Sequence, residues 1–443
     1  MLTEKELLQK ANQPSREAMR LHPYYRGKIE IVPKCRVSSF KDFAVWYTPG
    51  VAAPCRKISE NKEMVYEYTN KWNTVAVVSD GTRVLGLGDI GPEAGLPVME
   101  GKALLFKYLG GVDAFPLCLA TKEKEEIIKT VKILQPSFGG INLEDISQPK
   151  CFEILSRLRN ECEIPVWHDD QQGTAAVTLA ALINALKITG REMRSVKVAM
   201  VGAGAANICI ARMIIAAGVV PENIIMCDTG GTLHRERTEL KETHKEKWEI
   251  CEKTNKEGVK GAIPETMEGA DVLIALSRPG PGTIRKEWVV RMNKDAVCFV
   301  CANPIPEIWP WEAKEAGARI VATGRSDFPN QVNNSLGFPG IFRGALDVRA
   351  AAITDGMCVA AAGELARCAE DKGLSEDYLI PTMDEWEVYP REAAAVGMKA
   401  IEEGVARKEM SREEILKNAA RIIKRARKET AALMKGGFIS PAD

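Results

Sequence analysis

The stretch that decides the fold is Val196-Lys-Val-Ala-Met-Val-Gly202-Ala-Gly204-Ala-Ala-Asn207, an apolar run that passes through two glycines into small residues. This pattern predicts a buried strand, a tight turn and a helix. A second apolar run, residues 224–227, ends at Asp228. In such a unit the glycines let a pyrophosphate approach the backbone, the helix N-terminus offers free N–H groups, and the acidic residue binds ribose hydroxyls. The predicted dinucleotide-binding residues are Gly202, Ala203, Gly204, Ala205, Ala206 and Asp228.

The choice between NAD and NADP depends on the residues around Asp228. A carboxylate at this position favours NAD, because it repels the 2′-phosphate of NADP. His234, Arg235 and Arg237 lie close by in the sequence and could hold a phosphate, but an interpretation as a solvated loop ranks ahead. We therefore expect NAD, with NADP as the alternative. Asn207 stands where a third small residue is usual, which leaves the local helix packing open.

Strand-like and helix-like segments alternate on both sides of this motif, as they do in α/β proteins. The strands expected before it are residues 74–79, 114–119 and 165–167, and those expected after it are 224–227, 272–276, 297–301 and 320–323. Helices are expected at 100–109, 122–134, 150–160 and 173–189, and Pro14, Pro23 and Pro33 are expected to break the helical start of the chain. The predicted fold is α/β with two domains: an N-terminal α/β domain over residues 1–170 and a Rossmann-type dinucleotide-binding domain over 171–390, followed by C-terminal helices over 391–443.

Composition excludes several classes of function. Lys plus Arg and Asp plus Glu number 60 each in the 443 residues, so no overall field attracts nucleic acid or an anionic membrane. The N-terminus lacks the apolar core of a signal peptide, and no apolar stretch is long enough to span a bilayer. The 12 cysteines are scattered, which favours reduced thiols and a cytoplasmic location.

Two acidic pairs predict a metal site. Asp169 and Asp170 end a short apolar run, and Glu144 and Asp145 follow the turn Gly139-Gly140-Ile141-Asn142. Taken singly, each pair is more often solvated or a helix cap. Together, at the ends of apolar segments in one domain, they require a cation, because like charges in a cleft repel. Oxygen ligands of this type suit Mg²⁺ or Mn²⁺.

Three further side chains are candidates for chemistry. Tyr47 precedes a Pro-Gly turn, Arg83 lies in the glycine-rich loop 79–91, and Lys102 lies on a helix among apolar neighbours. Arginine can bind a carboxylate through two hydrogen bonds. If Lys102 is buried near Arg83 and a metal, we expect its pKa to fall, which would make it a usable base.

Amide side chains follow strands of the second domain. Asn303 precedes Pro304, and Asn333 and Asn334 precede a Ser-Leu-Gly-Phe-Pro-Gly segment. Ligands bind at the carboxyl ends of strands in such sheets, so these amides are well placed for a substrate or for the nicotinamide. A role in turns is an equally good explanation for each of them alone.

These segments together resemble the malic enzyme family in its short form. The resemblance runs from about residue 20 to about residue 400 and is carried by the motifs at 47–52, 79–89, 144–145, 169–175, 202–206 and 333–334. It implies oxidative decarboxylation of L-malate to pyruvate and CO₂, with reduction of NAD(P)⁺ and help from a divalent metal. Family members are usually dimers or larger, so a homodimer or higher homo-oligomer is expected.

The resemblance also implies residue roles. The implied metal ligands are Glu144, Asp145 and Asp170, with Asp169 beside them as an outer partner. Lys102 would be the base that takes the hydroxyl proton of malate, and Tyr47 the acid that protonates C3. The implied substrate-binding residues are Arg83, Asn303 and Asn334, with Asn333 as a neighbour.

Two other functions stay open on the sequence alone. A malolactic enzyme, which keeps its cofactor bound and makes lactate, would show almost the same residues. A non-catalytic nucleotide sensor is disfavoured, because a sensor need not keep Tyr47, Lys102 and three acidic side chains together. An amino-acid dehydrogenase shares the two-domain plan but has no use for the clustered carboxylates.

Overall fold

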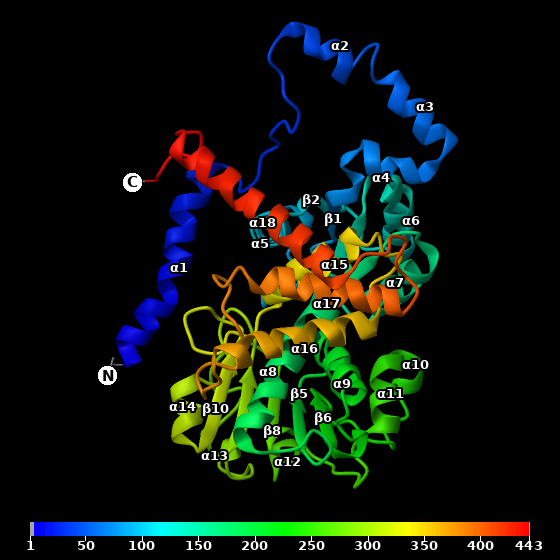
Figure 1. Ribbon diagram of the computed structural model, residues 1–443. Helices are drawn as coiled ribbons and strands as arrows, with labels where there is room; N and C mark the ends of the chain where they lie inside the picture. The colour runs from blue at the N-terminus through cyan, green and yellow to red at the C-terminus, as the bar shows by residue number, and fades with distance from the viewer. Residues whose placement is uncertain (1–3, 443) are drawn as a thin grey trace.

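The protein, described here by a computed structural model covering residues 4–442, is built around two separate sheets (Figure 1). The first sheet has the order β2-β1-β3-β4 and all of its strand pairs are parallel. The second has the order β10-β9-β8-β5-β6-β7, and only the β6–β7 pair is antiparallel. This confirms the α/β fold with an N-terminal domain and a Rossmann-type domain.

The first sheet consists of β1 (Thr74–Ser79), β2 (Asp113–Cys118), β3 (Gly140–Leu143) and β4 (Val166–His168), with β1 completely buried. Helices α5 (Pro92–Gly110), α6 (Lys124–Leu134) and α7 (Lys150–Glu161) connect these strands. The expectation of a turn at 139–142 was wrong, because residues 140–143 form β3. Glycine is required at position 140, where a Cβ would lie 2.9 Å from the ring of Phe342.

The second sheet consists of β5 (Val198–Val201), β6 (Ile224–Asp228), β7 (Gly231–Thr232), β8 (Val272–Ala275), β9 (Ala296–Val300) and β10 (Ala318–Thr323). Helix α9 (Ala205–Ala216) follows β5 through the glycine turn, as the sequence predicts. Cys298 on β9 and Cys301 directly after it are both buried free thiols.

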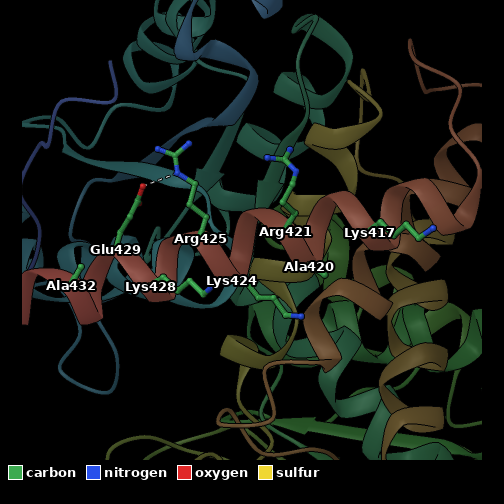
Figure 2. Close-up of a pocket in the computed structure, with 8 residues that line it drawn as sticks. All are labelled: Lys417, Ala420, Arg421, Lys424, Arg425, Lys428, Glu429 and Ala432. Carbon is green, nitrogen blue, oxygen red and sulfur yellow. Dashed lines mark hydrogen bonds and ion pairs between the residues drawn. The ribbon is translucent and has the colours of Figure 1, made fainter. Parts of the chain in front are cut away.

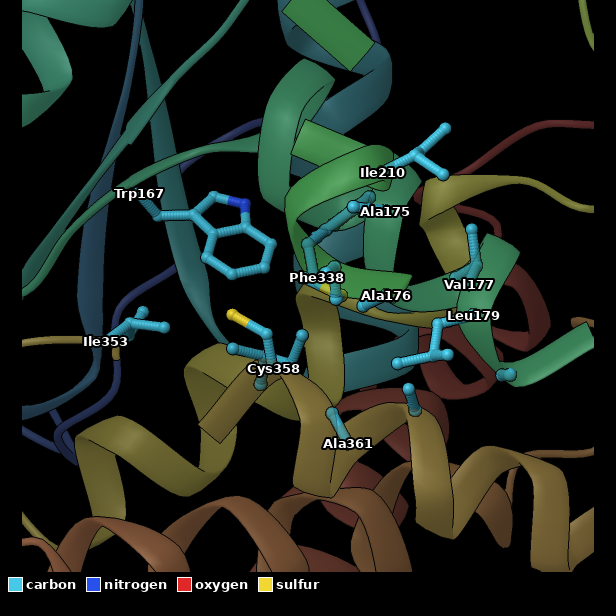
Figure 3. Packing of buried hydrophobic residues seen from close by; sticks show 14 of the residues in the cluster. Trp167, Ala175, Ala176, Val177, Leu179, Ile210, Phe338, Ile353, Cys358 and Ala361 are labelled. Carbon is cyan, nitrogen blue, oxygen red and sulfur yellow. The ribbon is translucent and has the colours of Figure 1, made fainter. Parts of the chain in front are cut away.

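Helix α8 (Thr174–Thr189) joins the two domains and lies inside the core. It packs against α9 and against α16 (Asp355–Lys372). Figure 3 shows Ala175, Ala176 and Leu179 of α8 among apolar side chains from other elements. A helix that is apolar on all sides is stable only when it is enclosed. Helix α8 is therefore a buried connection between the two domains.

The helices after the second sheet return to the first domain. Helix α15 (Phe338–Asp347) and helix α18 (Arg412–Lys435) both pack on α5, and α17 (Val388–Glu402) packs between them (Figure 1). Arg343 of α15 is fully buried, and it donates to Asp347 at 2.9 Å and to Asn73 of the first domain at 2.5 Å. The two domains are therefore tied together by a charge-assisted buried contact.

Residues 4–60 form an arm that leaves the body of the molecule (Figure 1). Helix α1 (Glu4–Tyr25) contains Pro14 and Pro23, so the expectation that these prolines break the helix was wrong. Each proline removes only one backbone donor, and the remaining turns can continue. The short helices α2 (Phe43–Trp46) and α3 (Ala52–Glu60) extend away from both sheets (Figure 1) and contain no buried residue. Among residues 4–442, no helix is both long and apolar enough to cross a membrane.

Candidate active site

Parallel pairing of β3 with β4 brings the two acidic pairs together. Leu143 is the register partner of His168, so the residues that follow, Glu144 and Asp169, leave the sheet at the same level. Oxygen atoms of Glu144, Asp145 and Asp170 all lie within 4.8 Å of one another. The backbone N–H of Asp145 donates to Oδ2 of Asp170 at 2.8 Å. The ends of β3 and β4 thus place the carboxylates of Glu144, Asp145 and Asp170 close together.

The backbone at this point adopts two unusual conformations. Asp145 has a φ of 54°, a left-handed conformation that costs free energy for a residue with a side chain. Residues Asp169–Gly173 form a π-helical turn, η5, before α8 begins. A Cβ at Gly173 would lie 2.0 Å from Oδ1 of Asp169, so only glycine permits this turn. Strain and π-turns concentrate at functional sites, where surrounding packing enforces them.

The electrostatics of the cluster are unfavourable without a positive ion. Burial and the charges of neighbouring carboxylates raise the pKa of Asp145 to about 8. Burial also raises the pKa of Glu144 well above its usual range, and Lys102 offsets only part of that effect. Each carboxyl would need to stay protonated or to find a cation.

The donor set fits a hard divalent cation. Oδ2 of Asp145 is buried and has no hydrogen-bond partner among the described residues, whereas the side chain of Asp170 is 34% exposed and opens the cluster to solvent. Three carboxylates with an open side match the ligands that Mg²⁺ or Mn²⁺ takes when several positions remain for water and substrate. His168 is fully buried beside them, and burial lowers its pKa. Its Nδ1 lies 3.6 Å from Oδ2 of Asp170.

Lys102 lies at the edge of this cluster. Its Nζ is 2.5 Å from Oδ2 of Asp169 and 3.1 Å from Oε1 of Glu144, and it donates to Oδ1 of Asn334 at 3.4 Å. The ammonium also sits 4.4 Å from the centre of the Phe338 ring. Helix α5 therefore holds one buried amine between the metal cluster and an amide of the second domain.

Without a cation in the cluster, the pKa of Lys102 is raised, whereas the expected fall was tied to a nearby metal. Burial by itself lowers the pKa of Lys102, but the carboxylates of Asp169 and Glu144 outweigh burial and raise it. The sequence could indicate burial from the apolar neighbours on α5. It could not indicate that two carboxylates would face the amine from other elements.

The glycine-rich loop 79–91 brings the domains into contact. A Cβ at Gly86 would lie 2.2 Å from the backbone oxygen of Asn303, so this close approach requires glycine. Arg83 is exposed at the same loop, its backbone N–H donates to the carbonyl of Asp145 at 3.0 Å, and its Nη1 donates to the carbonyl of Leu85 at 2.6 Å. The loop that carries Arg83 therefore touches the backbone of Asn303 in the second domain and, through its own backbone, Asp145 in the first.

The two neighbouring asparagines have different surroundings. Asn333 accepts from the N–H of Ser335 at 3.0 Å and donates to the carbonyl of Gly324 at 3.2 Å, so both ends of its side chain stabilise the loop. Asn334 instead turns toward Lys102. We therefore keep Asn334 as the candidate for substrate binding and give Asn333 the supporting role.

The glycine turn fits a pyrophosphate. Gly202 has a φ of 97°, and a Cβ there would lie 2.6 Å from the carbonyl oxygen of Leu276. Gly204 precedes α9, and a Cβ there would meet nothing within 4 Å, so the space before the helix N-terminus is open. Residues 202–206 can thus present free N–H groups to a dinucleotide.

Asn207 stabilises this turn. It is fully buried, and its Nδ2 donates to the carbonyls of Val201 at 3.0 Å and of Gly202 at 2.7 Å. The sequence left the packing of this helix open. In the structure the side chain of Asn207 links the start of α9 to the end of β5 through these hydrogen bonds. The π-turn η5 packs against α9, which joins the metal cluster to the nucleotide-binding unit.

Tyr47 does not join the other candidates within one chain. It lies between α2 and α3 on the arm, its side chain is 72% exposed, and its hydroxyl has no hydrogen bond to any of residues 4–442. Lys102, in contrast, is only 7% exposed. No pattern in the sequence near Tyr47 predicts the direction in which this arm leaves the rest of the molecule.

The comparisons with known proteins agree with this geometry. The family model for the malic enzyme N-terminal domain matches residues 26–159, and that for the malic enzyme NAD binding domain matches residues 171–401. The chain belongs to the malic enzyme family.

Individual relatives cover almost the whole chain. It is 50% identical over 406 residues to a bifunctional malic/malolactic enzyme of Bacillus subtilis, covering 92% of this chain and 98% of the relative. It is 51% identical over 384 residues to an NAD-dependent malic enzyme of Geobacillus stearothermophilus, covering 86% and 78%. The crystal structure of the Entamoeba histolytica malic enzyme is 48% identical with a TM-score of 0.98, covering 100% of this chain and 93% of that one. Other relatives, at 40–43% identity, are named NADP-dependent malic enzymes.

A hollow on the C-terminal helix is separate from this site. Figure 2 shows it along α18, lined by Lys417, Ala420, Arg421, Lys424, Arg425, Lys428, Glu429 and Ala432. Arg425 and Glu429 pair there at 2.8 Å. The basic residues of 421–428 that line this hollow therefore belong to the polar face of α18.

Proposed function

We propose that this malic enzyme family member converts L-malate to pyruvate and CO₂ while reducing NAD(P)⁺. The observation that carries the proposal is the position of Nζ of Lys102, between Asp169 and Glu144, beside a three-carboxylate cluster. A buried base next to a metal site and an open dinucleotide turn is what an alcohol oxidation followed by decarboxylation requires.

Each residue has a distinct task in this proposal. Glu144, Asp145 and Asp170 would hold Mg²⁺ or Mn²⁺, and residues 202–206 would hold the pyrophosphate of the cofactor. When bound, the cation supplies a Lewis acid for the oxygen on C2 of malate, and the nicotinamide accepts hydride from the same carbon. Nζ of Lys102 takes the hydroxyl proton.

The neighbours of Lys102 prepare it for that role. Asp169 also accepts from Nε1 of Trp167 at 3.2 Å, so its carboxylate is fixed from both sides. Glu144 is one of the three carboxylates that raise the pKa of Lys102, with Asp169 and Asp170. As a metal ligand, Glu144 would have its charge neutralised by the cation, so it would raise the pKa of Lys102 less. Asn334 and Arg83 would bind the malate carboxylates, and Asn303 would face malate or the nicotinamide.

The exposed arm favours a homodimer in which Tyr47 serves the second copy. Phe40, Trp46 and Tyr47 are 88%, 51% and 72% exposed on an arm that leaves its own domain (Figure 1). Exposed apolar side chains gathered on one segment mark a surface for interaction with another protein. In this proposal the arm of one copy covers the other copy and brings the phenol of Tyr47 to protonate C3 of the product.

The direct test is absorbance at 340 nm with L-malate, Mn²⁺ and either NAD or NADP. Reduced cofactor and CO₂ should form together in equal amounts. If no CO₂ is released with any combination of cofactor and metal, the protein is a nucleotide-binding relative without this activity.

A second candidate is malolactic activity, favoured by the B. subtilis relative that is named for both activities. The same residues would serve, with the reduced cofactor kept bound to return its hydride. Lactate formed from malate without net NADH would establish that outcome.

A further inference from the structure

Glu307 is a buried carboxylate that lies between the ends of two neighbouring strands. It belongs to the loop that follows β9, and its side chain is fully buried. Oε1 accepts hydrogen bonds from the backbone N–H of Ser277 at 2.8 Å and from the hydroxyl of Ser277 at 3.2 Å. Oε2 accepts from the backbone N–H of Ala302 at 3.1 Å. One side chain thus joins the loop after β8 to the loop after β9.

The backbone ladder between β8 and β9 stops where this carboxylate begins. The N–H of Cys301 still donates to the carbonyl of Ala275 at 3.0 Å. Beyond that point the N–H groups of Ser277 and Ala302 donate to different oxygens of Glu307 instead. A buried N–H group must find an acceptor. The carboxylate therefore lets the two loops leave the ladder while both N–H groups stay satisfied.

Both loops lie at the interface between the dinucleotide turn and the first domain. A Cβ at Gly202 would lie 3.2 Å from Cα of Ser277, so the loop after β8 touches the glycine turn. A Cβ at Gly86 would lie 2.7 Å from Cγ of Pro279 and 2.2 Å from the backbone oxygen of Asn303. The loops after β8 and β9 therefore both meet the glycine-rich loop of the first domain.

The strand order indicates which half of a dinucleotide reaches these loops. β8 and β9 lie on one side of β5, and β6 lies on the other. Asp228 ends β6 and pairs there with Arg237 and with Lys247, at 2.7 Å each, so the interpretation of Arg237 as part of a solvated loop was wrong. In a unit of two mononucleotide-binding halves, the acidic residue marks the adenosine half. The nicotinamide half is therefore expected beside β8 and β9.

We propose that Glu307 is a positioning residue for the nicotinamide, which sets the distance between that ring and C2 of malate by holding the loops after β8 and β9. The proposal rests on the proposed function, since it concerns the hydride-transfer step of the same reaction. Glu307 does not touch the reacting atoms. It acts through Ser277 and through the loop that carries Asn303. Hydride transfer depends on this support, because a small displacement of one reactant lowers the rate steeply.

The alternative is that Glu307 contributes only to the stability of the second domain. The two roles differ in what they do to the enzyme that remains folded. A stability role lowers the amount of folded enzyme and leaves its chemistry unchanged. A positioning role slows hydride transfer in the folded enzyme and weakens the contacts of the nicotinamide, but not those of the adenosine half.

The first test is isothermal titration calorimetry of the full chain with NAD and with ADP-ribose, which lacks the nicotinamide. Glutamine offers one acceptor oxygen, so Glu307→Gln keeps one loop and places an NH₂ group against the N–H of the other. This variant should bind NAD roughly 3- to 10-fold more weakly and ADP-ribose within about twofold of the parent. Glu315→Gln on α14 (Pro310–Glu315) is the matched control, because Glu315 is 63% exposed and pairs with Lys286.

The second test is the isotope effect on kcat with L-malate deuterated at C2. At pH 8, above the pKa of about 7 that burial gives Glu307, the parent carboxylate is largely ionised and accepts from both loops. Glu307→Gln should lower kcat roughly 10- to 100-fold and raise the isotope effect, because hydride transfer becomes the slow step. Glu315→Gln should change neither quantity.

Two outcomes overturn the inference: equal losses of affinity for NAD and ADP-ribose, or a lower kcat with an unchanged isotope effect. If Glu307→Gln does not fold, Ser277→Ala removes only the hydroxyl donor and should shift the same quantities in the same direction by about two- to threefold. No shift in that variant also overturns the inference. Failure of the proposed function would look different, since the parent would not oxidise malate while Glu307→Gln would still weaken NAD selectively in the calorimeter.

Discussion

Nζ of Lys102 and Oδ2 of Asp169 lie 2.5 Å apart, and both side chains are buried. The pair joins α5 to the π-turn that follows β4, so the position of the amine depends on the acid. Asp169 is not one of the three clustered ligands, which makes it possible to separate the support of Lys102 from the binding of metal.

Replacing Asp169 by Asn should lower kcat roughly 10- to 100-fold, the usual effect of removing a partner that orients a functional group. Asparagine keeps the shape but removes the charge, so the amine loses the shorter of its two ion pairs. The Mn²⁺ activation constant should change much less than kcat. A variant that loses metal affinity and keeps its kcat at saturating Mn²⁺ would show that Asp169 acts as a ligand instead.

Replacing Lys102 by Ala should lower kcat roughly 10²- to 10⁴-fold, the contribution of a positioned general base. The matched control is Lys107→Ala on the same helix, because Lys107 is 39% exposed and pairs with Asp113 and Glu429 away from the cluster. The control should retain activity. Turnover of Lys102→Ala within a few-fold of the parent enzyme would remove Lys102 from the role of base.

Metal binding should be visible as thermal stability. Saturating Mn²⁺ should raise the melting temperature by about 3–5 °C, because it binds only the folded cluster and relieves the repulsion between carboxylates. Asp170→Asn should abolish this rise, raise the Mn²⁺ requirement for activity steeply, and make the metal-free protein slightly more stable. Glu153→Gln is the control, since Glu153 is 46% exposed and pairs with Lys124. An equal Mn²⁺ effect in both variants would contradict the assigned site.

Glu307 should make stability depend on pH. It is fully buried, and it accepts hydrogen bonds from the backbone N–H groups of Ser277 and Ala302, at the ends of β8 and β9. Burial raises the pKa of Glu307 from 4.5 to about 7. The folded state then keeps a proton that the unfolded chain releases, so this contribution is complete below pH 4.5 and is lost as pH rises through 7.

Glu307→Gln removes the titrating group and provides the comparison. The free energy of unfolding of the parent relative to the variant should fall by up to about 3 kcal/mol between pH 5 and pH 7.5. Urea unfolding at several pH values measures this difference. A difference that stays constant across the range would mean that Glu307 remains ionised in the fold.

Local patterns were sufficient to predict much of the fold and part of the candidate site. The apolar runs at 74–79 and 224–227 predict strands because buried parallel strands are continuously apolar. The Gly-Ala-Gly sequence at 202–204 predicts the tight turn between a strand and a helix that the structure shows. The acidic pairs were recognised because they end such runs, and pairing of neighbouring strands then brings them together without further information.

The remainder depended on contacts between distant residues. Gly140 looked like a turn because nothing nearby shows that Phe342 packs over it. The pairing of Asp228 with Lys247 spans 19 residues, and the hydrogen bond of Lys102 to Asn334 spans 232. The sequence could identify Tyr47 as a candidate, but no local pattern in it determines the direction in which the arm leaves the body of the molecule.

The exposed position of Tyr47 leads to a test that needs no structure of the dimer. Tyr47→Phe and Lys102→Ala should each be nearly inactive alone. If Tyr47 serves the second copy, refolding an equal mixture of the two variants should restore about a quarter of the parent activity, because half of the dimers are mixed and one of their two sites then has both residues intact. A mixture of either variant with itself is the control. If Tyr47 instead folds back onto its own Lys102, every site in every dimer carries one defect, and the mixture stays as inactive as its components.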